Sequence, residues 1–259
     1  MFSWLWPGGT RKKALAQKWT TEERELLLQW VPMLKVLPSP LFERALKVTR
    51  VMLAERSWQA PRDESLTPMQ RMMVAAQAAV LVIGNEDYYF DRVTSVVIHR
   101  HTFRRAHWRG GKGMLKGAVR LDGEAHQFGA IVLAWPGVWE GAEEPCDGRN
   151  VVFHEFAHHL DGLDGDMGGV PPMPTASERK HFESVINSAY EAFGDQLDSY
   201  DEPLLDEYAA ESMAEFFAVS SENFFERPRE LYNWNEELYH ILAGFYRLDP
   251  AEWNWNELV

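Results

Sequence analysis

The chain has 259 residues, of which 46% are hydrophobic and 13% aromatic, enough for a full core in one domain or a small pair of domains. Its formal net charge of -13 excludes a general attraction to nucleic acid or anionic membranes, which needs clustered Lys and Arg. The single cysteine, Cys146, excludes an internal disulfide and a cysteine-rich zinc cluster, and no stretch approaches the roughly 18 apolar residues of a membrane helix. We therefore expect a cytoplasmic protein without a membrane span.

The first third of the chain has the pattern of helices. Residues 1–13 carry a short apolar run followed by basic residues, the reverse of a secretory signal, and we expect them to form a flexible tail. Apolar residues at helical spacing predict helices within residues 20–60, and Thr67-Pro68 opens another. Residues 14–88 are thus expected to form an N-terminal helical layer.

Short strands follow. Residues 95–99 and 129–135 are β-branched and bounded by turn residues, whereas residues 117–122 are a weaker strand candidate. The basic stretch 104–116 matches no phosphate-binding motif and is expected to be a solvated loop. Because peptidases can bind substrate by strand addition, residues 129–135 are a candidate sheet edge; the alternative is a buried central strand.

The sequence His154-Glu155-x-x-His158 carries the chemistry. On a helix, positions i and i+4 share one face, so both imidazoles can bind one cation while Glu155 reaches a water beside it. Asn150 is a plausible N-cap, and an apolar stripe runs beside the histidines. His159 lies off the ligand face and is expected to make a polar contact at the helix edge.

A catalytic zinc ion usually has three protein ligands, so one more is needed. After an expected loop over 164–174 and a helix over 177–193, strong helix formers over 206–222 predict another helix. Glu211, Glu215 and Glu222 are the candidates on it. Glu215 lies between Ala214 and Phe216, which suits a partly buried carboxylate, with Glu211 the next choice. If the helix is continuous, Tyr208 and Glu215 share a face.

Segments 154–161 and 208–219 resemble the Mlc titration factor A family of bacterial zinc peptidases. Residues 129–135 and 222–225 are also similar, and the likeness is weakest before about residue 60. The catalytic core of that family is similar to that of the anthrax lethal factor protease. The resemblance implies an α+β fold that is mainly helical, with a small sheet beside an HExxH zincin helix of the gluzincin type. Residues 89–259 would be the catalytic core, in one compact domain with the preceding part or separate from it.

The same resemblance implies roles for individual residues. His154, His158 and Glu215 would bind one Zn²⁺ per chain, Glu155 would be the general base, and Tyr208 would stabilise the oxyanion. In thermolysin-like enzymes an Asp follows the ligand Glu by four residues, but Val219 stands there in this chain. The groups that support the ligands must come from elsewhere, and the candidates are Asp161, Asp164 and Glu222.

Two functions follow as hypotheses. The first is a zinc metallopeptidase, aminopeptidase-like or oligopeptide-cleaving, which the resemblance also links to the glucose repressor Mlc and so to glucose-uptake gene expression. The second is a non-catalytic protein that sequesters such a transcriptional repressor. The Trp-rich segments 231–238 and 251–258 offer a partner surface, or they pack onto their own domain.

Overall fold

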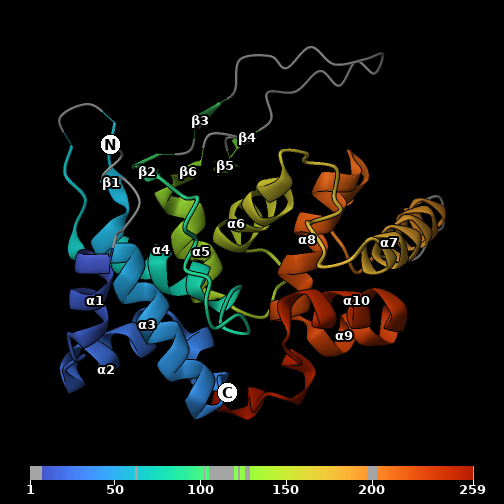
Figure 1. Ribbon diagram of the computed structural model, residues 1–259. Helices are drawn as coiled ribbons and strands as arrows, with labels where there is room; N and C mark the ends of the chain where they lie inside the picture. Colours follow the sequence, from blue (N-terminus) through green and yellow to red (C-terminus); the bar gives the residue numbers. More distant parts are fainter. Residues whose placement is uncertain are drawn as a thin grey trace, which may run out of the picture.

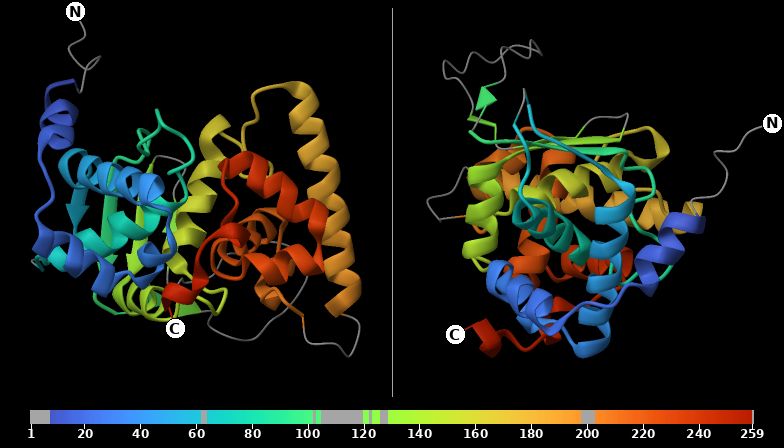
Figure 2. Two further views of the ribbon diagram at one scale, coloured as in Figure 1. Left: turned by 90° about the horizontal axis from the view of Figure 1, so that it is seen from below. Right: turned by 90° about the vertical axis from the view of Figure 1, so that its left-hand side faces the viewer.

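The computed structural model describes residues 8–61, 64–101, 103–104, 120–121, 123–125, 129–197 and 203–258. The N-terminal helices lie on one side of the molecule and the C-terminal helices on the other (Figures 1 and 2). Between them lie α6 (Val151–Asp161) and α8 (Met213–Glu226), with a small sheet above α6 in the view of Figure 1. The mainly helical α+β class expected from the sequence is confirmed.

The helices expected in the first third of the chain are present: α2 (Thr21–Trp30), α3 (Ser39–Glu55) and α4 (Pro68–Val80). Thr20 and Thr67 begin α2 and α4 with reciprocal capping boxes, in which the third helical residue, Glu23 or Gln70, bonds back to the cap. These caps use the backbone N–H groups that a helix start leaves without partners. A short 3-10 helix, η2 (Pro32–Val36), joins α2 to α3.

The expected tail over 1–13 is partly wrong, because residues 8–13 belong to α1 (Gly8–Ala16), whereas residues 1–7 lie outside the described part. Arg11 fixes this helix to the rest of the molecule. Its guanidinium forms an ion pair with Glu55 at 2.6 Å, at the end of α3, and a second ion pair with Asp91. Among the basic residues after the apolar run, Arg11 therefore anchors the first helix.

The four-stranded sheet has the order β1-β2-β6-β5, with these bounds: β1 (Ser57–Gln59), β2 (Ser95–His99), β6 (Ala130–Ala134) and β5 (Gly123–Ala125). The first three strands are parallel, and β5 pairs antiparallel to β6. Within residues 117–122, only the pair Arg120–Leu121 is described as a strand; this strand, β4, pairs with β3 (Phe103–Arg104) outside the main sheet. Residues 105–116, the expected basic loop, lie outside the described part.

Of the two alternatives for residues 129–135, the sheet edge is wrong and the buried central strand is observed. Strand β6 is central, because it pairs with β2 on one side and β5 on the other. Its apolar residues fit this position, and Ile131 and Leu133 are fully buried. Strand β5 is the edge of the described sheet on the side that packs beside α6.

The second half of the chain is helical, with these elements besides α6 and α8: α5 (Trp135–Glu143), η3 (Gly162–Asp164), α7 (Ala176–Leu197), η4 (Glu207–Ala210), α9 (Pro228–Trp234) and α10 (Glu236–Tyr246). No helix is predicted from the sequence at α5, whose two glycines lower helix propensity. Gly141 suits this position, because a Cβ atom would lie only 3.0 Å from Cα of Asn150, a tight contact. The glycine therefore lets α5 approach the start of α6.

One hydrophobic core extends from Leu27 in α2 to Trp253 near the C-terminus, and so includes both the N-terminal layer and the expected catalytic part. The Trp-rich C-terminal segment contributes to this core. Trp253 is buried, the indole of Trp255 donates to the Pro250 carbonyl at 2.8 Å, and η6 (Trp255–Leu258) packs on η2. Of the two alternatives for this segment, packing onto the protein itself is the one observed.

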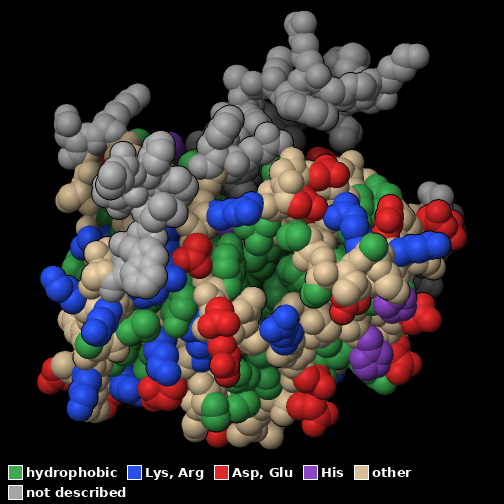
Figure 3. Space-filling model, in the orientation of Figure 1, with side chains coloured by type: hydrophobic (Ala, Val, Ile, Leu, Met, Phe, Trp, Pro, Cys, Tyr) green, Lys and Arg blue, Asp and Glu red, His purple; other side chains and the backbone are tan. Residues whose placement is uncertain are grey.

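On the face drawn in Figure 3, hydrophobic side chains gather in a hollow with charged side chains around it. A cavity of about 700 Å³ lies between α7 and α10 and is lined by residues that include Met173, Phe182, Ile241 and Arg247. Across the described residues, none of the helices has the length and apolar character required to cross a membrane.

Candidate metal centre

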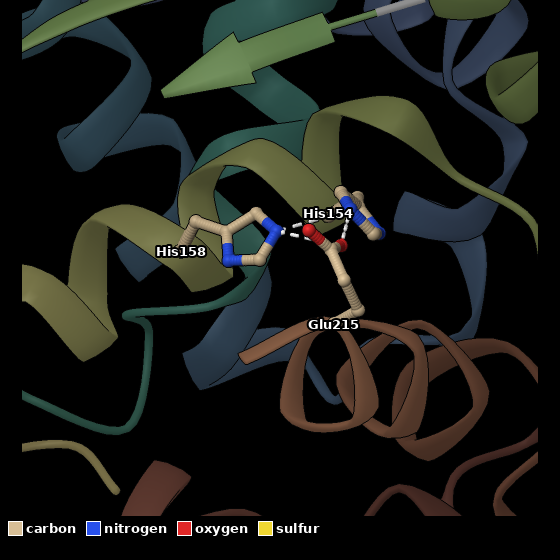
Figure 4. A group of neighbouring side chains, drawn as sticks. All are labelled: His154, His158 and Glu215. Atoms are coloured by element: carbon tan, nitrogen blue, oxygen red, sulfur yellow. Dashed lines mark hydrogen bonds and ion pairs between the residues drawn. The ribbon is translucent and has the colours of Figure 1, made fainter. Parts of the chain in front are cut away.

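Helix α6 places His154 and His158 on one face. As expected, Asn150 is its N-cap, and its side-chain oxygen accepts from the N–H groups of Val152 and Phe153, both at 3.1 Å. The opposite face is apolar and buried. This combination fixes the axial position and the rotation of the helix, so the two imidazoles point away from the core toward α8 (Figure 4).

Glu215 reaches the histidines from α8 (Figure 4). Its Oε2 lies 3.0 Å from Nε2 of His154 and 3.0 Å from Nε2 of His158, and the two Nε2 atoms are 3.1 Å apart. Within the described ranges, these residues are the one group of three or more His, Cys, Asp or Glu side chains whose ligand atoms lie within 4.8 Å of one another.

The donor set fits zinc. Two imidazole nitrogens and a carboxylate oxygen at 2.0–2.1 Å from a tetrahedral Zn²⁺ would be about 3.3 Å apart. The observed separations of 3.0–3.1 Å need only a small expansion. The side chains thus already converge on a single point that one cation can occupy.

The expected continuous helix over 206–222 is wrong. The chain forms η4 (Glu207–Ala210) and then begins α8 anew at the N-cap Ser212, whose hydroxyl accepts from the N–H of Glu215 at 3.2 Å. Ser212-x-x-Glu215 is the sequence pattern of a capping box, which could have predicted this break. Here Glu215 is not bonded back to the cap, because its carboxylate is directed to His154 and His158.

Tyr208 therefore does not share a helix with Glu215, yet it lies at the same site. Its ring centroid is 5.9 Å from that of His154. Burial, followed by the nearby carboxylates of Glu215, Glu211 and Glu155, raises the pKa of the Tyr208 hydroxyl. The hydroxyl consequently stays protonated at neutral pH and is available as a donor.

Glu155 is buried next to the metal ligands. Glu155 is 5% exposed, and its negative charge contributes to raising the pKa of both His154 and Tyr208. A carboxylate within electrostatic reach of a ligand histidine and of a tyrosine hydroxyl suits proton transfer at that point. Glu211, the other sequence candidate for the third ligand, is exposed and lies outside the ligand group.

Of the three candidates for supporting the ligands, Glu222 contacts one. Nδ1 of His154 donates to Oε1 of Glu222 at 2.7 Å, which leaves Nε2 as the nitrogen that could bind a cation. Asp161 instead accepts from the N–H of Gly169 at 2.8 Å, and Asp164 pairs with Arg179 at 3.0 Å. Glu222 lies seven residues after Glu215, two turns of α8, where the thermolysin spacing would not have located it.

Nearby carboxylates shift the pKa of His154, and the two histidines in turn shift the pKa of Glu215. Burial lowers the pKa of His154, but Glu222, Glu215 and Glu155 outweigh it and raise that pKa well above its usual range. Burial lowers the pKa of His158. Burial raises the pKa of Glu215, but the hydrogen bonds from both histidines outweigh this and lower it. Since metal-binding imidazoles must be neutral, a cation entering this site displaces a proton from His154.

His159 is separate from this group, as expected. It is buried on another side of α6, where its Nε2 lies 3.3 Å from the hydroxyl of Tyr88 and its ring packs near Phe90. Burial and the charges of Arg92 and Arg56 lower the pKa of His159 to about 4. The imidazole is therefore neutral and structural at physiological pH.

Two histidines of an HExxH helix and a glutamate from a second helix, in an α+β fold, define a metallopeptidase class of site. Residues 8–247 match the model of the family described as glucose-regulated metallo-peptidase M90. The chain belongs to this family, which is also that of Mlc titration factor A.

Individual relatives agree with this. The chain is 29% identical to Mlc titration factor A of Yersinia pestis (strain Pestoides F) over 96% of its own length and 91% of the relative. The protein of the same name from Yersinia pseudotuberculosis serotype O:3 (strain YPIII) gives the same values. This chain is also 31% identical to the uncharacterized protein slr2042 of Synechocystis sp., over 78% of this chain and 74% of the relative.

Proposed function

We propose that this metallopeptidase family member is a zinc-dependent peptidase that cleaves peptides through His154, Glu155, His158, Tyr208 and Glu215. The observation that carries the proposal is the convergence of three ligand atoms, 3.0–3.1 Å apart, next to a buried HExxH glutamate. His154, His158 and Glu215 would hold the ion. When bound, zinc supplies a Lewis acid that polarises a carbonyl and lowers the pKa of water towards about 7.

The remaining steps belong to side chains. Glu155 takes the proton of the attacking water and passes it to the leaving amine. Tyr208 donates its hydroxyl hydrogen to the oxygen on which negative charge develops, and its raised pKa keeps that hydrogen in place. Glu222 holds the His154 ring through Nδ1, so that the imidazole keeps one orientation during turnover.

Strand β5 is the proposed substrate-binding edge, in place of β6. It ends the four-stranded sheet and packs beside α6, which brings its backbone to the helix that carries the histidines. A peptide added as a further strand would gain main-chain hydrogen bonds there. Substrates with a methylated backbone nitrogen next to the scissile bond should bind less tightly than their unmethylated equivalents.

The test uses two variants beside the wild type. Glu155→Gln should bind about one zinc ion per chain and lose hydrolysis of a peptide library, because the general base is gone while the ligands remain. Glu215→Ala should lose zinc as well as activity, because a ligand is gone. Metal analysis of dialysed protein and peptide cleavage by mass spectrometry measure both. Wild-type protein that takes up no zinc would overturn the proposal.

A second function, binding of a Mlc-like transcriptional repressor in the cytoplasm, is favoured by the name of the Yersinia relatives. The exposed free Cys146 suits a reducing compartment. Glu155→Gln separates the two functions, because it should retain repressor binding in a pull-down while hydrolysis is lost. Repressor binding without any peptidase activity of the wild type would favour the non-catalytic binding protein.

A further inference from the structure

A buried asparagine lies where the two metal-binding helices meet. Asn150 is 3% exposed, and it caps α6 through its side-chain oxygen. Capping uses only that oxygen, so Ser, Thr or Asp would serve equally well there. The amide nitrogen of Asn150 is not needed for the cap, and its contacts must be explained separately.

That nitrogen, Nδ2, contacts one residue on each of three other helices. It lies 3.0 Å from Oε1 of Gln77 in α4, 3.0 Å from the carbonyl of Gly141 in α5 and 3.0 Å from Oε1 of Glu226 in α8. Gly141 leaves the room for it, since a Cβ atom there would lie 3.0 Å from Cγ of Asn150. The start of the histidine helix is thus fixed against α4, α5 and α8 by one side chain.

Glu226 holds the α8 side of this contact. It is 2% exposed, and its second oxygen accepts from the N–H of Gly148 at 3.1 Å. One turn earlier on α8, the two carboxylate oxygens of Glu222 also accept from two different donors. Oε2 accepts from the N–H of Asn150 at 2.5 Å, and Oε1 accepts from Nδ1 of His154. Burying two carboxylates one turn apart is costly unless each oxygen has a donor.

These contacts have a consequence for the ligands. All three ligand atoms come from α6 and α8, so their separation depends on how these helices are placed against each other. Glu222 sets the ring orientation of His154, and its other oxygen accepts from the backbone N–H of Asn150, whose position depends on the side-chain contacts of that residue. A shift of about 1 Å at a site of this kind is enough to impair it.

We propose that Asn150 and Glu226 are positioning residues of the metal centre, which hold Glu222 and the start of α6 so that His154 meets Glu215. The inference rests on the proposed zinc site and extends it to two residues that touch neither metal nor substrate. Their amide–carboxylate contact sets the geometry of the ligands. Its loss weakens metal binding while the fold is kept.

The test compares zinc dissociation constants of folded variants, measured by competition with a chromophoric chelator. Asn150→Ser keeps a good N-cap and removes the Nδ2 contacts. Glu226→Gln keeps the shape but can accept from only one of its two donors. Each should weaken zinc binding about 10–100-fold, the range for residues behind metal ligands. The double variant should weaken zinc binding by less than the two single effects combined, because both changes act on the contact between Asn150 and Glu226.

Ser221→Ala is the matched control. Ser221 is buried on α8 beside Glu222, but its hydroxyl joins Phe217 and Tyr246. The control should lose stability in urea and bind zinc within about threefold of the wild type, because the Ser221 hydroxyl contacts Phe217 and Tyr246 and none of the groups that hold His154.

Wild-type zinc affinity in Asn150→Ser and Glu226→Gln would overturn the inference while leaving the proposed zinc site intact. Absence of zinc uptake by the wild type would overturn both. Should one variant not fold, the other decides. The visible spectrum of cobalt-loaded protein gives a second reading, because it should change in the Asn150 and Glu226 variants and stay unchanged in the control.

Discussion

The role proposed for Tyr208, stabilisation of the oxyanion, requires the hydrogen of its hydroxyl group. Its ring lies 5.9 Å from that of His154, and burial together with Glu215 keeps its hydroxyl protonated. Removal of an oxyanion donor typically lowers kcat about 10²–10³-fold. We expect Tyr208→Phe to lower kcat by that factor in steady-state peptide cleavage and to leave the zinc content unchanged.

The control is Tyr232→Phe, which removes the hydroxyl of an exposed tyrosine on α9 that bonds only to Glu236 among the described contacts. Its kcat should equal that of the wild type. A Tyr208→Phe enzyme with wild-type kcat would show that this tyrosine is a structural neighbour of His154 and that the oxyanion is stabilised without it.

At the scale of elements, the break between η4 and α8 determines where Glu215 lies. Ser212 begins α8 by accepting from the N–H of Glu215 itself. Loss of an N-cap costs about 1 kcal/mol. We expect Ser212→Ala to lower the free energy of unfolding by that amount in urea titrations and also to weaken zinc binding, because the first turn of α8 carries the ligand.

Thr20→Ala is the matched control, since Thr20 caps α2 far from the metal ligands in the chain and likewise bonds the third helical residue. Stability should fall by a similar amount while the zinc affinity is unaltered. Equal zinc affinities in the two alanine variants would mean that Glu215 keeps its place without the cap.

Local signals allowed much of the helical structure to be predicted from the sequence. Thr20, Thr67 and Asn150 cap helices with side chains only a few residues away, and the HExxH spacing depends on one helix alone. Pairing between strands and packing between helices are not local. The central position of β6 depends on residues 123–125, and the support of His154 by Glu222 depends on how α6 and α8 meet.

Helix α5 and the break at Ser212 show two further causes of error. Gly137 and Gly141 lower the helix propensity of α5, but Gly141 also allows the close approach to Asn150, so tertiary packing outweighs propensity. The good helix formers around Ser212 concealed a capping pattern whose glutamate is used elsewhere. In both places, contacts between helices outweigh the local sequence pattern.

For the molecule as a whole, the end of α6 makes stability depend on pH. Asp161 is fully buried where α6 passes into the loop before α7, and it accepts from the N–H of Gly169. Gly169 in turn packs on Met213, the first residue of α8, and leaves no room for a Cβ atom. Burial raises the pKa of Asp161 to about 7, against 3.8 for an ordinary aspartate.

The sign of the effect follows from linkage. Below about pH 4 the carboxyl is protonated in both states, whereas between about pH 4 and 7 the unfolded chain releases the proton and the folded protein retains it. Rising pH in this window therefore favours unfolding, by at most about 4 kcal/mol, and the loss is complete above about pH 7.

Asp161→Asn removes this titration and keeps an acceptor for the N–H of Gly169. Relative to the wild type, the variant should gain free energy of unfolding as the pH rises from 4.5 to 8, as measured by urea denaturation with a chelator present to exclude metal. Taking the difference between the two proteins cancels the titration of all other groups. A difference that is the same at both pH values would show that Asp161 is ionised in the folded protein throughout. The buried carboxylate of Asp161, which contacts Gly169 between α6 and α8, would then be stabilised as a charge by other contacts of the loop.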